Sequence, residues 1–163
     1  DDPGRSARAL KEIQVALSQR PQAATIHATA AKIYAHLGRP EDAITQLQEA
    51  ARLAPKFLDY HFDLARAYAA AHQYERAIAE YQAVLALDPK FFDARYNLGN
   101  LYLDLHRPHE ASEQYAAIIA ANPRIPDVWH NLAAAYYAAG DMPKAQWAKQ
   151  RALALEAEAR PGR

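Results

Sequence analysis

Apolar and small residues recur along the chain at the spacing of one helix face. In the stretch DARYNLGNLYLDL, Leu98, Gly99 and Tyr102 stand at i, i+1 and i+4, and further on Ala111 and Tyr115 stand four residues apart. This spacing fits a helix of 3.6 residues per turn with one buried face. No segment alternates apolar and polar residues as a half-buried strand would. The pattern therefore predicts an all-α chain.

The helical pattern itself repeats every 34 residues. Self-similarity at a fixed period is the mark of a repeat architecture, in which each unit buries its apolar face against its neighbours. Five columns of residues keep the period: Pro21, Pro55, Pro89 and Pro123; Tyr34, Tyr68, Tyr102 and Tyr136; Ala9, Ala43, Ala77, Ala111 and Ala145; Ala30, Leu64, Leu98 and Leu132; and Ala31, Ala65, Gly99 and Ala133.

Each period contains two helices separated by a turn. Pro108 suits the first turn of the second helix, where its missing N–H is not needed, and Pro123 ends that helix. Gly38 and Gly140 occupy the turn between the helices, where a residue with positive φ commonly closes the first helix. His72 and His106 take the same place in the two middle periods.

These residues resemble the tetratricopeptide repeat family, whose pattern is W-x2-L-G-x2-Y, then A-x3-F, then P, over 34 residues. The match covers four repeats, called here the first to fourth: residues 24–57, 58–91, 92–125 and 126–159. Residues 4–23 resemble the second helix of a truncated repeat, since GRSARAL aligns with GRPEDAI. The resemblance implies one array over residues 1–163, an α-solenoid in which antiparallel helix pairs form a right-handed superhelix, with the C-terminal helix as cap.

The third repeat follows the family pattern most closely, and the other repeats depart from it at several positions. The third repeat carries Leu98, Gly99, Tyr102, Ala111, Tyr115 and Pro123, and the fourth supplies the signature tryptophan as Trp129. The departures are His27, His61 and Arg95 in place of tryptophan, Lys149 in place of the aromatic residue, and Ala157 in place of the closing proline.

Gly99 stands inside a predicted helix, where glycine costs roughly 1 kcal/mol relative to alanine. A residue without a side chain lets the neighbouring helix approach closely. Because the other repeats have alanine in this column, we expect Gly99→Ala to be mild and Gly99→Leu to be disruptive. Tyr102 and its equivalents are expected to fill the adjoining core.

Composition and charge narrow the function classes. Nineteen basic residues balance nineteen acidic ones, so bulk charge suggests neither nucleic acid nor an anionic membrane as partner. No apolar run approaches the roughly 18 residues of a membrane span, and we expect no membrane insertion. The chain has no cysteine, which removes disulfides and thiolate chemistry. The compartment stays open between cytoplasm and bacterial periplasm.

No motif points to catalysis, a cofactor or a metal. The seven histidines include the pair in HRPH, His106 and His109, but no carboxylate completes a recognised ligand pattern around them. Catalytic and phosphate-binding motifs are likewise missing from the sequence. We therefore predict a protein that is not an enzyme and has no metal site and no cofactor.

By resemblance to the family, the concave surface formed by the first helices of the repeats binds extended peptides. Asn97 and Asn131 lie one repeat apart there, and their amides can donate to and accept from a peptide backbone. Exposed aromatic residues are enriched at binding surfaces. The alternatives are solvated asparagines and aromatics packed on the adjacent repeat. The candidate groove residues are Phe62, Arg66, Tyr96, Asn97, Asn100, His130, Asn131 and Tyr137.

The family's two-carboxylate clamp for acidic C-terminal peptides fits this sequence poorly. Aspartates stand in several columns where the clamp needs cations, among them Asp63, Asp93 and Asp127. In the first turn of a helix, Asp59, Asp93 and Asp127 serve more simply to interact with exposed N–H groups. A groove with more aspartates than cations favours a neutral or basic partner segment.

We therefore expect a protein–protein interaction module, an adaptor or scaffold that binds an extended peptide or partner segment. The alternative is structural: self-assembly or spacing within a larger protein, with the groove empty or filled by a neighbouring copy. Leu10, Ile13 and Leu17 of the first helix are expected to include exposed apolar surface, which offers a route to self-association, and further repeats are expected to precede it. Lys149, Glu156 and Glu158 suit a polar terminal helix.

Overall fold

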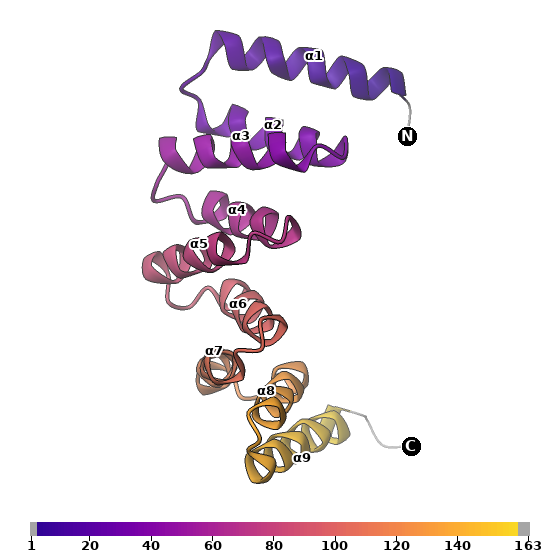
Figure 1. Ribbon diagram of the computed structural model, residues 1–163, viewed down its shortest axis with the longest axis vertical. Helices are drawn as coiled ribbons and strands as arrows, with labels where there is room; N and C mark the ends of the chain where they lie inside the picture. The colour runs from indigo at the N-terminus through magenta and orange to yellow at the C-terminus, as the bar shows by residue number, and fades with distance from the viewer. Residues whose placement is uncertain (1–2, 160–163) are drawn as a thin grey trace. The chain divides into compact units, whose positions relative to one another are not determined.

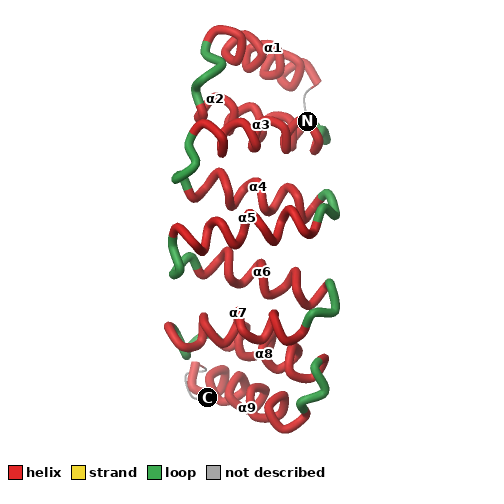
Figure 2. Tube along the Cα trace, turned by 60° about the vertical axis from the view of Figure 1, so that its left-hand side comes forward, coloured by secondary structure: helices red, strands yellow, loops and turns green. Residues whose placement is uncertain are grey.

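The computed structural model describes residues 3–159, with side chains from residue 7 onward. Within that range the chain is helical and contains no strand, which confirms the all-α prediction (Figure 1). Short turns join successive helices (Figure 2). The helices are α1 Pro3–Gln19, α2 Ala24–His36, α3 Pro40–Leu53, α4 Leu58–Ala70, α5 Tyr74–Leu87, α6 Phe92–Asp104, α7 Pro108–Ala121, α8 Pro126–Ala138 and α9 Met142–Ala159.

The helices fall in pairs within the predicted periods. The pairs α2–α3, α4–α5, α6–α7 and α8–α9 begin at the first residues of the four repeats, and α1 lies in the predicted half repeat. The chain divides into two compact units, Asp1–Pro89 and Lys90–Arg163, and each is described by itself. In the first unit, α1 packs on α2, α2 on α3, α3 on α4 and α4 on α5. In the second, α6 packs on α7, α7 on α8 and α8 on α9, and α6 also touches α8.

The turn inside each pair has the same geometry in all four repeats. Gly38 (φ 69°), His72 (φ 56°), His106 (φ 56°) and Gly140 (φ 80°) are all left-handed. In the first repeat the N–H of Arg39 donates to the Tyr34 carbonyl at 2.9 Å, a bond that closes the last helical turn. The other repeats make the equivalent bond at 2.8 or 2.9 Å. The 34-residue period is therefore a period of backbone conformation.

The repeating leucine, alanine and tyrosine columns supply most of the core. Leu64, Leu98 and Leu132 are each 2% exposed, and the alanines that face them from the second helices are also buried. Small residues in these columns let paired helices approach closely, as ridges-into-grooves packing requires. The buried alanines are Ala43, Ala77, Ala111 and Ala145.

Gly99 on α6 lies directly against the Tyr115 ring of α7. A Cβ atom built there would lie 2.8 Å from Cε1 and 2.9 Å from Cζ of Tyr115. The Tyr115 side chain is completely buried. The glycine in the middle of α6 therefore makes room for an aromatic ring of its own repeat.

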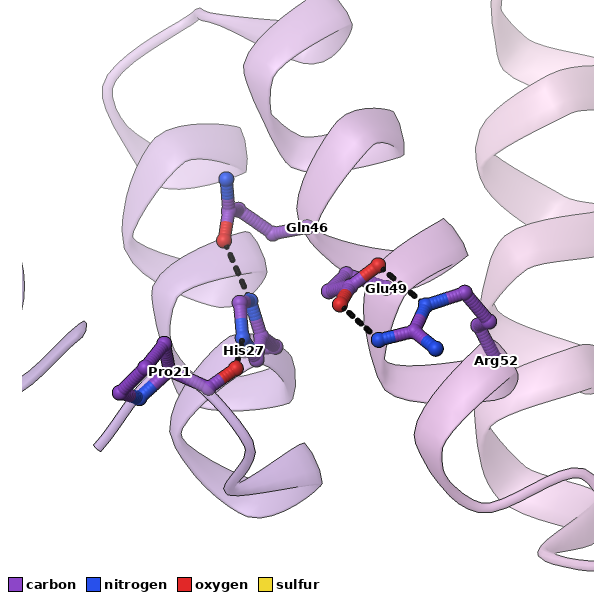
Figure 3. Close-up of polar contacts among 5 residues, drawn as sticks. All are labelled: Pro21, His27, Gln46, Glu49 and Arg52. Carbon is purple, nitrogen blue, oxygen red and sulfur yellow. Dashed lines mark hydrogen bonds and ion pairs between the residues drawn. The ribbon is translucent and has the colours of Figure 1, made fainter. Parts of the chain in front are cut away.

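The residues that replace tryptophan take over one of its contacts. Trp129 Nε1 donates to the Pro123 carbonyl at 2.8 Å, and His27 Nε2 donates to the Pro21 carbonyl at 2.9 Å. Figure 3 shows that His27 also reaches Gln46 on α3, with Nδ1 2.8 Å from Oε1. A histidine here therefore joins the preceding loop to the second helix of the same repeat.

His61 makes the equivalent two contacts, with a carboxylate in place of the Gln46 amide. Its Nε2 donates to the Pro55 carbonyl at 3.1 Å, and its Nδ1 lies 2.7 Å from Oε2 of Glu80 on α5. Arg95 reaches the matching residue of α7, donating from Nη1 to Gln114 Oε1 at 3.1 Å. The three departures from tryptophan thus tie the two helices of a repeat together through hydrogen bonds.

The two end helices agree with the sequence-based expectation at some positions and differ from it at others. On α1, Leu10 and Leu17 are partly exposed as expected, whereas Ile13 is buried and Val15 is 47% exposed. On α9, Lys149 and Glu158 are exposed as expected of a polar end, but Trp147 and Leu153 are also half exposed. Helix α9 therefore carries an outer surface that is partly apolar.

Candidate peptide-binding face

Six of the eight candidate groove residues lie on two helices of the second unit. Tyr96, Asn97 and Asn100 come from α6, and the remaining three from α8. Their spacing keeps them off the face that carries the buried Leu98 and Gly99. We call this set the α6–α8 face: Tyr96, Asn97, Asn100, His130, Asn131 and Tyr137.

A chain of hydrogen bonds joins four tyrosine and asparagine side chains across α6, α7 and α8. Asn131 Nδ2 donates to the Tyr96 hydroxyl at 2.9 Å and, more weakly, to Asn100 Oδ1 at 3.3 Å. The Tyr115 hydroxyl donates to the same Asn100 oxygen at 2.6 Å. The rings of Tyr96 and Tyr115 meet edge to face, with centroids 6.1 Å apart. We call these four side chains the tyrosine–asparagine network.

The buried Tyr115 side chain joins this network from α7. Burial of its ring raises the pKa of the Tyr115 hydroxyl above its ordinary value, because an ionised oxygen would lose its hydration there. The hydroxyl therefore stays a donor at neutral pH and fixes the orientation of the Asn100 side chain. The sequence placed Tyr115 in the apolar column of the core, and nothing in the spacing indicated that its oxygen reaches the α6–α8 face.

The network uses some polar atoms and leaves others open. Asn100 Oδ1 accepts two bonds, while Asn100 Nδ2 and Asn131 Oδ1 make none within residues 7–159. The side chain of Asn97 is half-buried and forms no hydrogen bond with the described side chains. The α6–α8 face thus presents amide donors and acceptors in orientations set by the network.

The last two residues of the α6–α8 face, His130 and Tyr137, differ in their contacts and exposure. His130 Nε2 lies 2.8 Å from Glu156 Oε1 on α9, so this histidine pairs with a carboxylate. Tyr137 is 66% exposed, a large value for a tyrosine on a helix. An aromatic ring exposed to this degree offers apolar contact area to a partner.

The other two candidate residues lie on α4, in the first unit. The Phe62 ring packs 6.0 Å from that of Tyr81 on α5, and the Arg66 guanidinium lies 5.9 Å from the Phe62 centroid. Arg66 is also 3.9 Å from the Asp63 carboxylate. Phe62 and Tyr81 therefore repeat the ring pair of Tyr96 and Tyr115, whereas Arg66 stands where the third repeat has Asn100.

The described part of the chain contains no group of three or more histidine, aspartate or glutamate side chains placed to hold a metal ion. Among the described helices, none is both long and apolar enough to cross a membrane.

Solved structures of similar fold belong to repeat proteins. A crystal structure of MamA superposes with a TM-score of 0.84 at 24% identity, covering 95% of this chain and 91% of that chain. A MamA segment from Desulfovibrio magneticus RS-1 gives a TM-score of 0.75 at 27% identity, with 83% and 76% covered. YrrB, described as a TPR protein with an unusual peptide-binding site, gives 0.81 at 22% identity, with 96% and 80% covered. None of the curated proteins matches the sequence.

Family models of the tetratricopeptide repeat match most of the chain. One, described as a tetratricopeptide repeat, matches residues 2–56 and 96–162, and another, described as a TPR repeat, matches residues 65–105. These matches agree with the 34-residue period, the helix pairs and the repeated turn. Proteins built from such repeats bind other proteins or peptides and are in general not enzymes. The chain therefore belongs to the tetratricopeptide repeat family and is a protein–protein interaction module.

Proposed function

We propose that the protein is an adaptor that binds an extended segment of a partner protein on the α6–α8 face. The observation that carries this proposal is the tyrosine–asparagine network, which holds Asn100 and Asn131 in fixed orientations with unused amide atoms. Fixing a side chain before binding lowers the entropy that the complex loses when it forms. A solvated asparagine on an ordinary helix surface has no such support.

The open atoms match a peptide backbone. Asn100 Nδ2 donates to a peptide carbonyl, and Asn131 Oδ1 accepts from a peptide N–H, so the two side chains together recognise one strand of backbone without reading its sequence. Asn97, three residues before Asn100 on α6, adds a third side-chain amide. The exposed ring of Tyr137 supplies apolar contact for a partner side chain.

Charge favours a neutral or basic segment. Asp93, Asp104 and Asp127 on α6 and α8 are all exposed, and no lysine or arginine belongs to the α6–α8 face. Acidic partners would therefore meet like charge, whereas a basic residue on the partner would find carboxylates nearby. Phe62 and Arg66 on α4 are candidate contacts of the first unit taken by itself.

The test begins with peptides selected from a displayed random library on the immobilised protein, measured by calorimetry. We expect micromolar dissociation constants that depend weakly on salt, because few charge pairs form. Replacing both Asn97 and Asn131 by alanine should weaken binding at least tenfold, from roughly two hydrogen bonds of about 1 kcal/mol each. Asn122→Ala, the same change in the turn after α7, is the matched control and should leave binding unchanged. Equal affinity of the double variant and the wild type would move the site elsewhere.

Thermal and urea unfolding of the single variants separate a binding role from a structural one. Asn131→Ala removes two donor contacts of the network and should cost about 1 kcal/mol of unfolding free energy. Asn97→Ala removes no intramolecular bond and should leave stability nearly unchanged. Binding lost in Asn97→Ala without loss of stability is the result that assigns this asparagine to the partner. Light scattering over a range of concentrations excludes self-assembly if the mass stays constant.

A further inference from the structure

An open hollow lies between α8 and α9, at the end of the second unit. Its volume is about 450 Å³, within the range of about 300–1,000 Å³ that ligand-binding pockets span. Three of its eight lining residues are alanines, and the other five have larger side chains. The lining residues are His130, Ala133, Ala134, Tyr137, Met142, Ala145, Gln146 and Lys149.

The hollow has a definite cause in the sequence. In the third repeat the corresponding space is filled by the Tyr115 ring, which lies against Gly99 and is completely buried. Thirty-four residues later the chain has Lys149 in place of that ring. An ammonium group is too costly to bury in an apolar space, so the lysine side chain turns to solvent and is exposed. The space between α8 and α9 is left without its aromatic filler.

The third repeat also shows what covers such a space. Helix α8 packs on both α6 and α7, and its Asn131 reaches Tyr96 and Asn100. One period later these two positions are His130 and Ala134, both in the lining of the hollow. None of the described helices of the second unit occupies the matching place on α8 and α9.

Among the described residues, α9 runs through the position at which the other repeats turn into a new helix. After Pro55, Pro89 and Pro123 a new helix begins within a few residues. The fourth repeat has Ala157 at that position, and α9 continues through it to Ala159. Within the described residues, no helix of the second unit follows α9 to cover the hollow.

We propose that this hollow docks an amphipathic helix of a partner protein, which inserts one aromatic side chain where Tyr115 stands in the third repeat and pairs a carboxylate with Lys149. Tyr137 and Met142 at the edge are 66% and 51% exposed and supply apolar contact. The site differs from the α6–α8 face in its occupant, a helix, and in its charge preference, although His130 and Tyr137 border both.

Charge decides that the partner helix is acidic near its aromatic residue. Lys149 makes no ion pair with the described residues, while His130 and Glu156 pair with each other. Lys149 is thus the open charge of the hollow, and a glutamate or aspartate one helical turn from the inserted ring would meet it. An aromatic side chain in a pocket bordered by a charge pair is a common arrangement at interaction hot spots.

Met142 is the single methionine of the chain and lines the hollow, so its NMR signal reports directly whether the hollow is occupied. Protein labelled with 13C in the Met142 methyl group is titrated with a synthetic 20-residue helical peptide, stapled on its polar face, whose apolar stripe carries one tyrosine and, one turn away, a glutamate. We expect a saturable shift of the Met142 signal at micromolar peptide. The peptide with alanine in place of tyrosine, and the peptide with lysine in place of glutamate, should each bind at least tenfold more weakly.

The matched variants are Lys149→Tyr, which restores the missing ring, and Gln150→Tyr, which adds the same ring at the next exposed position. Lys149→Tyr should abolish peptide binding without lowering the melting temperature, and Gln150→Tyr should bind as the wild type does. The proposal is overturned if peptide binding survives Lys149→Tyr, or if the Met142 signal does not shift at 1 mM peptide. It is also overturned if the Met142 signal changes with protein concentration alone, because a second copy of the chain would then be the occupant. The paired Asn97 and Asn131 substitutions should leave this titration unchanged, so failure here is distinguishable from failure of the α6–α8 proposal.

Discussion

Gly99 and Tyr115 show how two residues in adjacent helices depend on each other. The ring of Tyr115 occupies the place where a side chain of residue 99 would begin. In the second repeat Ala65 and Tyr81 hold the same columns, and both are buried. An alanine and a tyrosine are therefore compatible in this fold, provided that the ring sits slightly farther away. In the third repeat the bond from Tyr115 to Asn100 opposes that shift.

We expect Gly99→Ala to lower the free energy of unfolding by about 1 kcal/mol. Displacing the ring costs about 1–3 kcal/mol, and the gain in helix propensity returns about 1 kcal/mol. Gly99→Leu should cost at least about 3 kcal/mol, because its side chain has no space against the buried ring. Urea unfolding measures both. Ala65→Gly is the control and should cost about 1–2 kcal/mol, from helix propensity and the loss of a buried methyl group. A stabilising Gly99→Ala would mean that the ring moves freely.

The Tyr115 hydroxyl predicts a loss of stability at alkaline pH. Its pKa in the folded protein is raised above the ordinary value of about 10, so its contribution is fully present below pH 10 and is lost as pH rises through the folded pKa. Unfolding free energy measured from pH 8 to 12 should therefore fall along the alkaline limb, and Tyr115→Phe should make that limb shallower. Tyr137→Phe, at an exposed tyrosine, should leave its slope unchanged. Identical slopes for both variants would contradict the assignment.

At the scale of one element, the turn inside each helix pair is conserved in backbone shape even where its residue type changes. His72 and His106 adopt the left-handed conformation that Gly38 and Gly140 adopt. For a residue with a Cβ atom this conformation costs roughly 1–2 kcal/mol, whereas glycine has no such penalty. The bonds on either side of the turn are present in all four repeats, which shows that the surrounding helix ends impose the conformation.

His106→Gly should therefore stabilise the protein by up to about 1 kcal/mol, read as a higher melting temperature and a higher urea midpoint. The exposed His106 side chain loses little on removal. His72→Gly should gain less, because His72 Nδ1 also shares a hydrogen bond with the Tyr74 hydroxyl. Gly140→His provides the reverse change and should destabilise by a similar amount. No gain in His106→Gly would show that the histidine contributes contacts of its own.

Hydrogen bonds also explain how the helix pairs tolerate the loss of tryptophan. His27, His61 and Trp129 all donate to the carbonyl of the proline six residues earlier. The histidines add a hydrogen bond to the second helix, where Trp129 instead packs its ring on that of Trp147, with centroids 5.0 Å apart. In both histidines the two ring nitrogens are engaged, one with the loop and one with the second helix.

At the scale of the whole molecule, stability is the sum of local repeat terms. In such arrays each repeat contacts its neighbours, so damage to one core column spreads over a limited part of the chain. The tyrosine column illustrates this, since Tyr68 lies in the first unit and Tyr102 in the second, each 5% exposed. A cation lies over each ring, Arg76 at 5.6 Å and Arg107 at 4.7 Å.

Tyr68→Ala and Tyr102→Ala should each cost about 3 kcal/mol or more through the cavity left behind. Hydrogen exchange should show faster exchange in α4 and α5 for the first variant and in α6 and α7 for the second. Tyr137→Ala, which removes an exposed tyrosine, is the control and should change stability little. A uniform acceleration over the chain in both core variants would indicate a single cooperative block.

The sequence by itself determined the fold class, the helix pairs and the positive-φ turns. It did so because a 34-residue period leaves the same residue types in the same columns, and each column has one physical role: proline at a helix start or end, alanine at a helix contact, leucine in the core. The same columns identified the two helices that carry six of the eight candidate groove residues. That these residues bind a partner stays a prediction.

Only the tertiary structure decided which side-chain atoms are used and which are open. Tyr115 belongs to the core by its ring and to the α6–α8 face by its oxygen, and Asn131 bonds to Tyr96, a residue 35 positions earlier. Periodicity assigns a residue to one face of its helix, but its hydrogen bonds depend on the position of the polar atom at the end of the side chain. The hollow beside Lys149 is a second example. The sequence shows that Lys149 stands in the column of Tyr115, but the space left by the missing ring appears only when α8 and α9 are packed together.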